Sequence, residues 1–190
     1  MMKKIIYSLL FFFLVGNSIA QQTPAKAQTT DFSIEGATAH LGDGTVIENS
    51  LIMFAKGKIK FVGSAMTKIA RQGTVLDAKG KHVYPGFIAA NATLGLVEID
   101  AVKATNDQDE IGIMNPHIRS LIAYNAESKV VESMRPNGVL IAQITPRGGT
   151  ISGTSSIVQL DAWNWEDASI HTDDAIHMNW PSSFISGKWW

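Results

Sequence analysis

The chain has 190 residues, of which 45% are hydrophobic and 17% are charged, and its formal net charge is −1. The absence of a basic surplus argues against a nucleic-acid partner, and the apolar content argues against disorder. The sequence contains no cysteine, which excludes disulfides, thiolate metal sites and cysteine nucleophiles.

The beginning of the chain has the pattern of a secretory signal peptide over residues 1–20. Lys3 and Lys4 precede a short apolar run, and Ser18 and Ala20 place small residues at the −3 and −1 positions of a cleavage site. The apolar run is shorter than the ~18 residues that a membrane span needs. We therefore expect cleavage after Ala20, no membrane span in the mature chain, and an exported protein that is periplasmic or extracellular.

Residues 21–30 are polar and aperiodic, which predicts a flexible linker. Residues 31–84 then alternate short apolar runs with turn signals. Residues 51–55 and 58–63 flank Lys56 and Gly57, a pattern that predicts a β-hairpin within a small antiparallel β structure. The other turns and strands of this segment are expected at residues 42–44, 74–77, 78–81 and 82–84.

After Pro85 and Gly86 the pattern changes. Residues 87–90 and 139–144 are apolar runs without alternation, which are typical of strands buried on both faces. Between them, residues 116–134 carry apolar side chains at helical spacing, and residues 136–138 predict the end of that helix. Strand, helix and strand in this order predict a parallel crossover unit. A further strand is expected at residues 157–161, and the stretch from His171 to His177 is expected to be a solvated loop.

One stretch, at the boundary between these two regions, is specific enough to compare with a known family. Residues 77–96 read DAKGKHVYPGFIAANATLGL. They resemble the junction between the N-terminal β-sandwich and the barrel of the amidohydrolase superfamily, where the usual pattern is D-A-x-G-K-x-V-x-P-G-F-I-D-x-H-x-H. Residues 115–128 and 137–153 resemble the imidazolonepropionase-like branch of that superfamily. The resemblance extends over roughly residues 31–165.

The resemblance implies an α/β fold in two parts. The first part is a partial N-terminal β-sandwich at residues 31–84. The second part, at residues 85–190, consists of the first strand–helix–strand units of an incomplete (β/α)8 metal-dependent hydrolase barrel. A complete barrel takes about 250 residues, and the terminal Trp189 and Trp190 lack an obvious packing partner, so we expect a truncated barrel.

At the level of the superfamily, the resemblance implies a hydrolase of C–N bonds other than peptide bonds. Its substrates would be small-molecule amides or cyclic ureides, and divalent metal ions would activate the attacking water. In this chain, however, Asn91 and Thr93 stand at the positions of the two metal-binding histidines, and Ala89 stands at that of the aspartate. First-row metals prefer imidazole or anionic ligands to neutral oxygens. We therefore assign no catalytic residue, metal ligand or cofactor to this chain, and leave a zinc site to a longer parent protein.

The glycine-rich segment at residues 145–156 is the second distinctive feature. Backbone N–H groups in such a loop can bind an anion, so a ligand-facing loop is weighed against a purely structural one. A serine nucleophile from this segment with His117 as its base is disfavoured, because no residue orients the base. The loop residues considered to face a ligand are Arg147, Gly148, Gly149 and Ser152.

Three functional hypotheses follow. In the first, the chain is the N-terminal fragment of an exported amidohydrolase-family hydrolase that completes its metal site with other ligands. In the second, it is a non-catalytic amidohydrolase-like subunit of the periplasm that binds a ligand or an amidohydrolase-like partner. In the third, it is a free-standing periplasmic binding module. Enzyme activity is left open, because this chain lacks the metal ligands of the superfamily.

Overall fold

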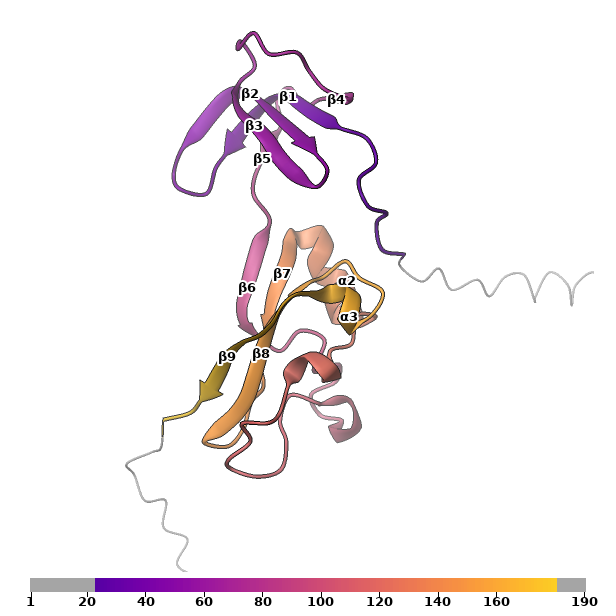
Figure 1. Cartoon of the computed structure of the whole chain (residues 1–190), viewed down its shortest axis with the longest axis vertical. Helices are drawn as coiled ribbons and strands as arrows, with labels where there is room; N and C mark the ends of the chain where they lie inside the picture. Colours follow the sequence, from indigo (N-terminus) through magenta and orange to yellow (C-terminus); the bar gives the residue numbers. More distant parts are fainter. Residues whose placement is uncertain (1–22, 181–190) are drawn as a thin grey trace, which may run out of the picture.

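Two β-sheets follow one another along the chain in this computed structural model, which describes residues 23–180 (Figure 1). The predicted signal peptide, its cleavage site at Ala20 and the terminal tryptophans lie outside the described residues. Residues 23–30 contain no helix or strand, and Gln28 donates from Nε2 to the carbonyl of Phe54 at 3.3 Å. No helix among residues 23–180 is long and apolar enough to cross a membrane.

The first sheet confirms the predicted hairpin and corrects the prediction of a purely antiparallel structure. Strands β2 and β3 are antiparallel around Lys56 and Gly57, whereas β4 and β5 both run parallel to β1. The parallel pairing arises because residues 65–73 carry the chain back to the start of β1 before β4 begins. The strands are β1 (Phe32–His40), β2 (Val46–Ala55), β3 (Lys58–Ser64), β4 (Thr74–Asp77) and β5 (His82–Val83).

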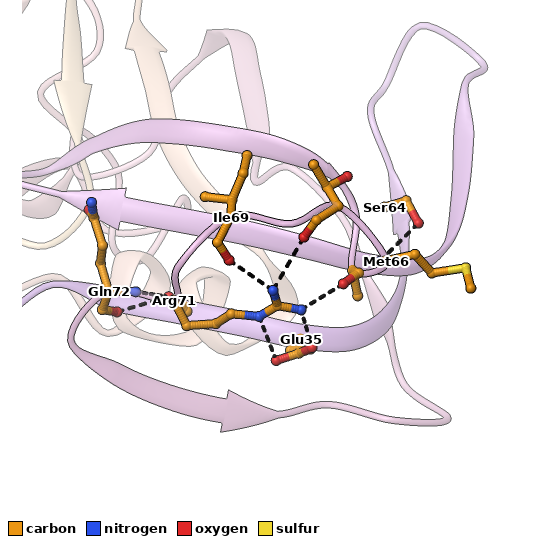
Figure 2. A network of polar contacts seen from close by, with 9 residues as sticks. Glu35, Ser64, Met66, Ile69, Arg71 and Gln72 are labelled. Atoms are coloured by element: carbon orange, nitrogen blue, oxygen red, sulfur yellow. Dashed lines mark hydrogen bonds and ion pairs between the residues drawn. The ribbon is translucent and has the colours of Figure 1, made fainter.

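Arg71 fixes this returning segment against the sheet, as Figure 2 shows. Its guanidinium donates to both carboxylate oxygens of Glu35 on β1, from Nη2 at 2.5 Å and from Nε at 3.2 Å. The same group donates to the carbonyls of Ala65 at 2.6 Å and Ile69 at 2.9 Å. One side chain therefore ties the returning segment both to itself and to β1. The ion pair lowers the pKa of Glu35 below its ordinary value.

The second sheet has the strand order β6-β7-β8-β9. Strands β6 and β7 are parallel, which confirms the predicted crossover, but β8 and β9 are antiparallel to their neighbours. A turn with Gly148 and Gly149 at positive φ reverses the chain directly after β7, and no barrel is evident in the described residues. The expected series of barrel units therefore does not extend past β7. The strands are β6 (Phe87–Ala92), β7 (Val139–Ile144), β8 (Ile151–Gln159) and β9 (Ser169–Met178).

The prediction of a single helix at residues 116–134 is wrong. This segment instead contains the 3-10 turn η2 (Ser120–Ala123) and the short helix α2 (Lys129–Met134). The backbone groups ahead of η2 pair with β8: Asn115 N–H donates to Ile151, and Ile118 accepts from Thr154 N–H. Because these backbone groups are hydrogen-bonded to β8, they are not available for the hydrogen bonds of a continuous helix. The other short elements are η1 (Lys103–Thr105), η3 (Arg135–Asn137) and α3 (Trp165–Ala168).

Two further expectations about the second sheet also fail. Phe87 and Ile88 on β6 are each 65% exposed, and because successive strand residues point to opposite faces, neither face is covered there. The stretch from His171 to His177 belongs to strand β9 and is not a loop. The buried core lies between β7, β8 and the crossover segment. It consists of Leu96, Leu121, Tyr124, Val131, Ala142, Ile144, Val158, Leu160 and Ala168.

We predict that Glu35→Gln flattens the acid dependence of stability. A carboxylate whose pKa is lowered by folding contributes stability above its unfolded pKa, and this contribution is lost as the pH falls through the folded pKa. The variant should therefore lose less stability than the wild type below about pH 4.5, the ordinary pKa of Glu35. Urea unfolding measured across this range tests the prediction. Glu48→Gln, at an exposed position on β2, is the control, and an equal flattening in that variant would contradict the assignment.

We also predict that Gly153→Ala is strongly destabilising. Gly153 has φ +128°, and a Cβ at this position would lie 2.5 Å from the carbonyl oxygen of Ile118. Backbone strain together with this clash should cost about 3 kcal/mol or more. Gly80→Ala is the matched control, because Gly80 has φ +75° with open space around it and should cost only about 1 kcal/mol. Equal losses of unfolding free energy would contradict the proposed close approach of Gly153 to Ile118.

Candidate functional site

The candidate site lies where β6 and β7 end side by side. Ala92 of β6 pairs with Ile144 of β7, so the residues that follow both strands meet at one end of the sheet. Arg147 donates from Nη1 to the side-chain oxygen of Asn91 and from Nη2 to the carbonyl of Asn91, each at 2.6 Å. Asn91 itself has φ +52°, in the left-handed region, and its N–H donates to Oε1 of Gln143 at 3.1 Å. The structure thus brings together two residues that the sequence singled out separately.

A chain of hydrogen bonds leads from Asn91 into the sheet. Gln143 donates from Nε2 to Oδ2 of Asp174 at 2.7 Å, and Ser155 donates its hydroxyl proton to Oδ1 of Asp174 at 2.6 Å. His177 Nε2 lies 2.8 Å from Ser155 Oγ. Because the single proton of Ser155 is given to Asp174, we assign His177 Nε2 as a donor to Ser155. Ser155 is fully buried, so this chain of hydrogen bonds is closed to solvent at its centre.

The two charged groups near His177 shift its pKa in opposite directions. Burial lowers the pKa of His177, Asp174 opposes that effect, and the positive charge of Arg147 lowers the pKa further. Arg147 therefore contacts Asn91 directly and influences His177 through its field. Hydrogen bonds and charge interactions therefore connect the end of β6 with the far strand β9.

The residues at the end of β6 do not fit a metal ion. The side-chain oxygen of Asn91 already accepts from a guanidinium, and a metal ion bound there would lie beside a positive charge. Thr93 lies beyond the last residue of β6, where its carbonyl accepts from Leu96 N–H. Among residues 23–180 no group of three or more His, Asp or Glu side chains is arranged to hold a metal ion.

Of the other residues of the predicted ligand-facing loop, Gly148 and Gly149 form a turn and Ser152 follows it. Ser152 lies in strand β8 and donates its hydroxyl to the carbonyl of Gly148 at 2.6 Å. Asn179 donates to the carbonyl of Gly149 at 2.8 Å. The structure places only Arg147, of the four predicted residues, against Asn91. The prediction that the loop faces a ligand stays a prediction.

A pocket of about 350 Å³ opens beside this turn. Pro146 lines it from the turn, and the acidic segment around Asp109 and the exposed His117 line it from the crossover. Arg147 N–H donates to the carbonyl of Gln108 at 2.6 Å, which joins the acidic segment to the site. The space is within the size range of small-molecule sites.

Sequence reasoning missed Gln143, Asp174 and His177. The sequence held one indication of Gln143, because it is the only polar residue in the apolar run of β7. Asp174 and His177 lie in a segment that was interpreted as a loop. Ser155 was considered as a nucleophile with His117, whereas the structure pairs it with His177.

Comparison with known proteins gives a partial structural match. The chain matches no protein-family model and no curated protein. It aligns with an amidohydrolase from Thermotoga maritima at a TM-score of 0.70 and 21% identity, over 77% of this chain and 38% of that chain. The chain shares its fold with part of an amidohydrolase. It thus spans less than half the length of that protein. A prolidase complexed with N-methylphosphonate-L-proline aligns at a TM-score of 0.39 and 18% identity, over 60% of this chain and 25% of that chain.

We predict that the pKa of His177 moves in opposite directions in two variants of this site. Arg147→Met should raise it by removing a positive charge, and Asp174→Asn should lower it by removing a negative one. An NMR titration of the His177 ring measures both shifts. Arg119→Met is the control, because Arg119 pairs with Asp173 in the same sheet. Shifts of the same sign in the first two variants would contradict the electrostatic assignment.

Proposed function

We propose that the chain is the N-terminal portion of an exported amidohydrolase-like protein that binds its ligand without hydrolysing it. The ligand would be a small-molecule amide or cyclic ureide, bound without a metal ion at the end of β6. The observation that carries this proposal is the contact of Arg147 with Asn91, the residue that the resemblance aligns with the first metal-binding histidine. In this proposal, the guanidinium of Arg147 takes the role of the metal ion that the superfamily binds from solution.

The guanidinium provides part of what a metal ion would provide. It carries more N–H donors than the two that contact Asn91, and those donors can bind a carbonyl oxygen of an amide or ureide. It cannot generate a nucleophile, because it stays protonated in proteins and coordinates no water as a metal ion does. The pocket beside Pro146 supplies space for a compact ligand. These features support recognition more than hydrolysis.

The second candidate is hydrolysis of C–N bonds other than peptide bonds by a longer protein. The fold shared with the Thermotoga maritima amidohydrolase favours it, since 38% of that chain is matched and its remainder lies outside the alignment. In this case further strands, from the same protein or from an amidohydrolase-like partner subunit, would supply zinc ligands. Arg147 would then have to leave Asn91 before a metal ion could bind there.

Export is part of the proposal, and it rests on the signal-like residues 1–20. Mass spectrometry of the protein recovered from its host shows whether the mature chain begins at Gln21. An intact N-terminus in the cytoplasm would remove this part of the proposal and leave the binding hypothesis standing.

We predict that removing Arg147 strengthens the zinc affinity that a restored histidine pair creates. The triple variant Asn91→His, Thr93→His, Arg147→Met should bind Zn²⁺ at least about tenfold more tightly than the double histidine variant, because the guanidinium no longer repels the ion. Isothermal titration calorimetry measures both affinities, with Arg147→Met alone as the control. Zinc binding by the wild type that is lost in Asn91→Ala would overturn the proposal and favour hydrolysis.

A further inference from the structure

The two sheets of the structure have separate hydrophobic cores. Leu51, Met53 and Ala65 form a core on the first sheet, whereas the core of the second sheet lies between β7, β8 and the crossover. Residues 84–86 connect β5 of the first sheet to β6 of the second. Units with separate cores move relative to one another unless a large apolar interface or a further connection restrains them. A fixed relative orientation of the two sheets therefore requires a restraint besides residues 84–86.

Residues 23–30 form a second connection between the sheets. Figure 1 shows this segment running from β1 toward the second sheet. The N–H of Ala25 donates to Oδ2 of Asp161 at 3.2 Å, across 136 positions of the sequence. Asp161 follows β8, and its Oδ1 lies 2.6 Å from Nη2 of Arg135, which belongs to the crossover. Ala25 therefore contacts a carboxylate that an ion pair already fixes to the second sheet.

Gln28 fixes the same segment to the first sheet. Its Oε1 accepts from the N–H of Gly57 at 2.6 Å, and its Nε2 donates to the carbonyls of Thr30 at 2.8 Å and Phe54 at 3.3 Å. Both polar atoms of the amide are thus used at the turn between β2 and β3. Residues 25–28, which we call the strap, therefore contact the second sheet at one end and the first sheet at the other.

We propose that the strap holds the two sheets in one relative orientation. From Ala25 to Gln28 the chain advances three residues, which span at most about 11 Å when fully extended. The hairpin turn at Gly57 therefore cannot move far from Asp161 while both ends of the strap are bound. The hydrogen bonds of the strap are exposed or partly buried and compete with water, so the strap can also open. Loss of the contact at either end should free the sheets to reorient about residues 84–86.

The strap lies at the opposite end of β7 from the site around Asn91. Asp161 follows Gln159, which pairs with Ile141 near the start of β7. Arg147, in contrast, follows the end of that strand. The strap therefore positions the first sheet without contacting the candidate site. Its opening would change the shape of the molecule and leave the contact of Arg147 with Asn91 intact.

Distances between two spin labels test whether the strap restrains the sheets. The chain contains no cysteine, so Lys58→Cys on β3 and His171→Cys on β9 place one label on each sheet, both at exposed positions. We expect double electron–electron resonance on the purified protein to give one narrow distance distribution. Ala25→Pro removes the N–H that donates to Asp161, and it should broaden the distribution at least about twofold. Gln28→Ala should have the same effect, because it removes the contacts with the first sheet.

Lys26→Ala is the matched control, because it alters an exposed residue between the two ends of the strap. Its distance distribution should stay as narrow as that of the unaltered strap. A broad distribution with the strap intact would overturn the proposal, and so would an unchanged width when Ala25→Pro and Gln28→Ala are combined.

Nitrogen-15 relaxation of the protein without labels provides a second readout. The two sheets should share one correlation time when the strap is intact and have two different ones in the double variant. Circular dichroism verifies the fold of each variant. If Ala25→Pro fails to fold, Gln28→Ala alone decides, because Gln28 belongs to neither core. These substitutions leave the contact of Arg147 with Asn91 unaltered, so failure of this inference and failure of the proposed function are distinguishable.

Discussion

The parallel pairing of β6 with β7 is the constraint on which the candidate site depends. In a parallel pair both strands end at the same edge, so the chain after β7 emerges next to Asn91, and Arg147 reaches it. An antiparallel β7 would place Arg147 at the opposite end of a six-residue strand, roughly 20 Å away. The long crossover from residue 93 to residue 138 is the cost of this arrangement, because parallel strands cannot be joined by a tight turn.

Features that depend on neighbouring residues were predictable. Strands β4 and β7 have the predicted bounds, and the turn at Lys56 and Gly57 produces the predicted hairpin. Features that depend on distant partners were not. The parallel direction of β4 depends on the segment that Arg71 ties to Glu35, 36 residues earlier, and the predicted helix is replaced by bonds to β8, a strand that follows it in the chain.

The candidate site likewise contains residues that the sequence could indicate and contacts that it could not. Asn91 was found through a motif and Arg147 through a glycine-rich segment, but their contact joins residues 56 positions apart and has no local signal. Asp174 and His177 were missed for a different reason. The register of β8 with β9 shifts near Ser155 and Ile157, and such bulges break the period-two alternation by which a strand is recognised. Irregularity in this strand therefore concealed the residues that it brings to the site.

The contact of Arg147 with Asn91 places a fixed positive charge at this end of the sheet. A metal ion both polarises a carbonyl and converts water into a nucleophile at neutral pH, whereas a guanidinium can only polarise. Ser155 does not supply the missing nucleophile, because it is buried, gives its proton to Asp174 and accepts from His177. A carbonyl compound bound to Arg147, as proposed above, would be held at the end of β6 by a fixed cation.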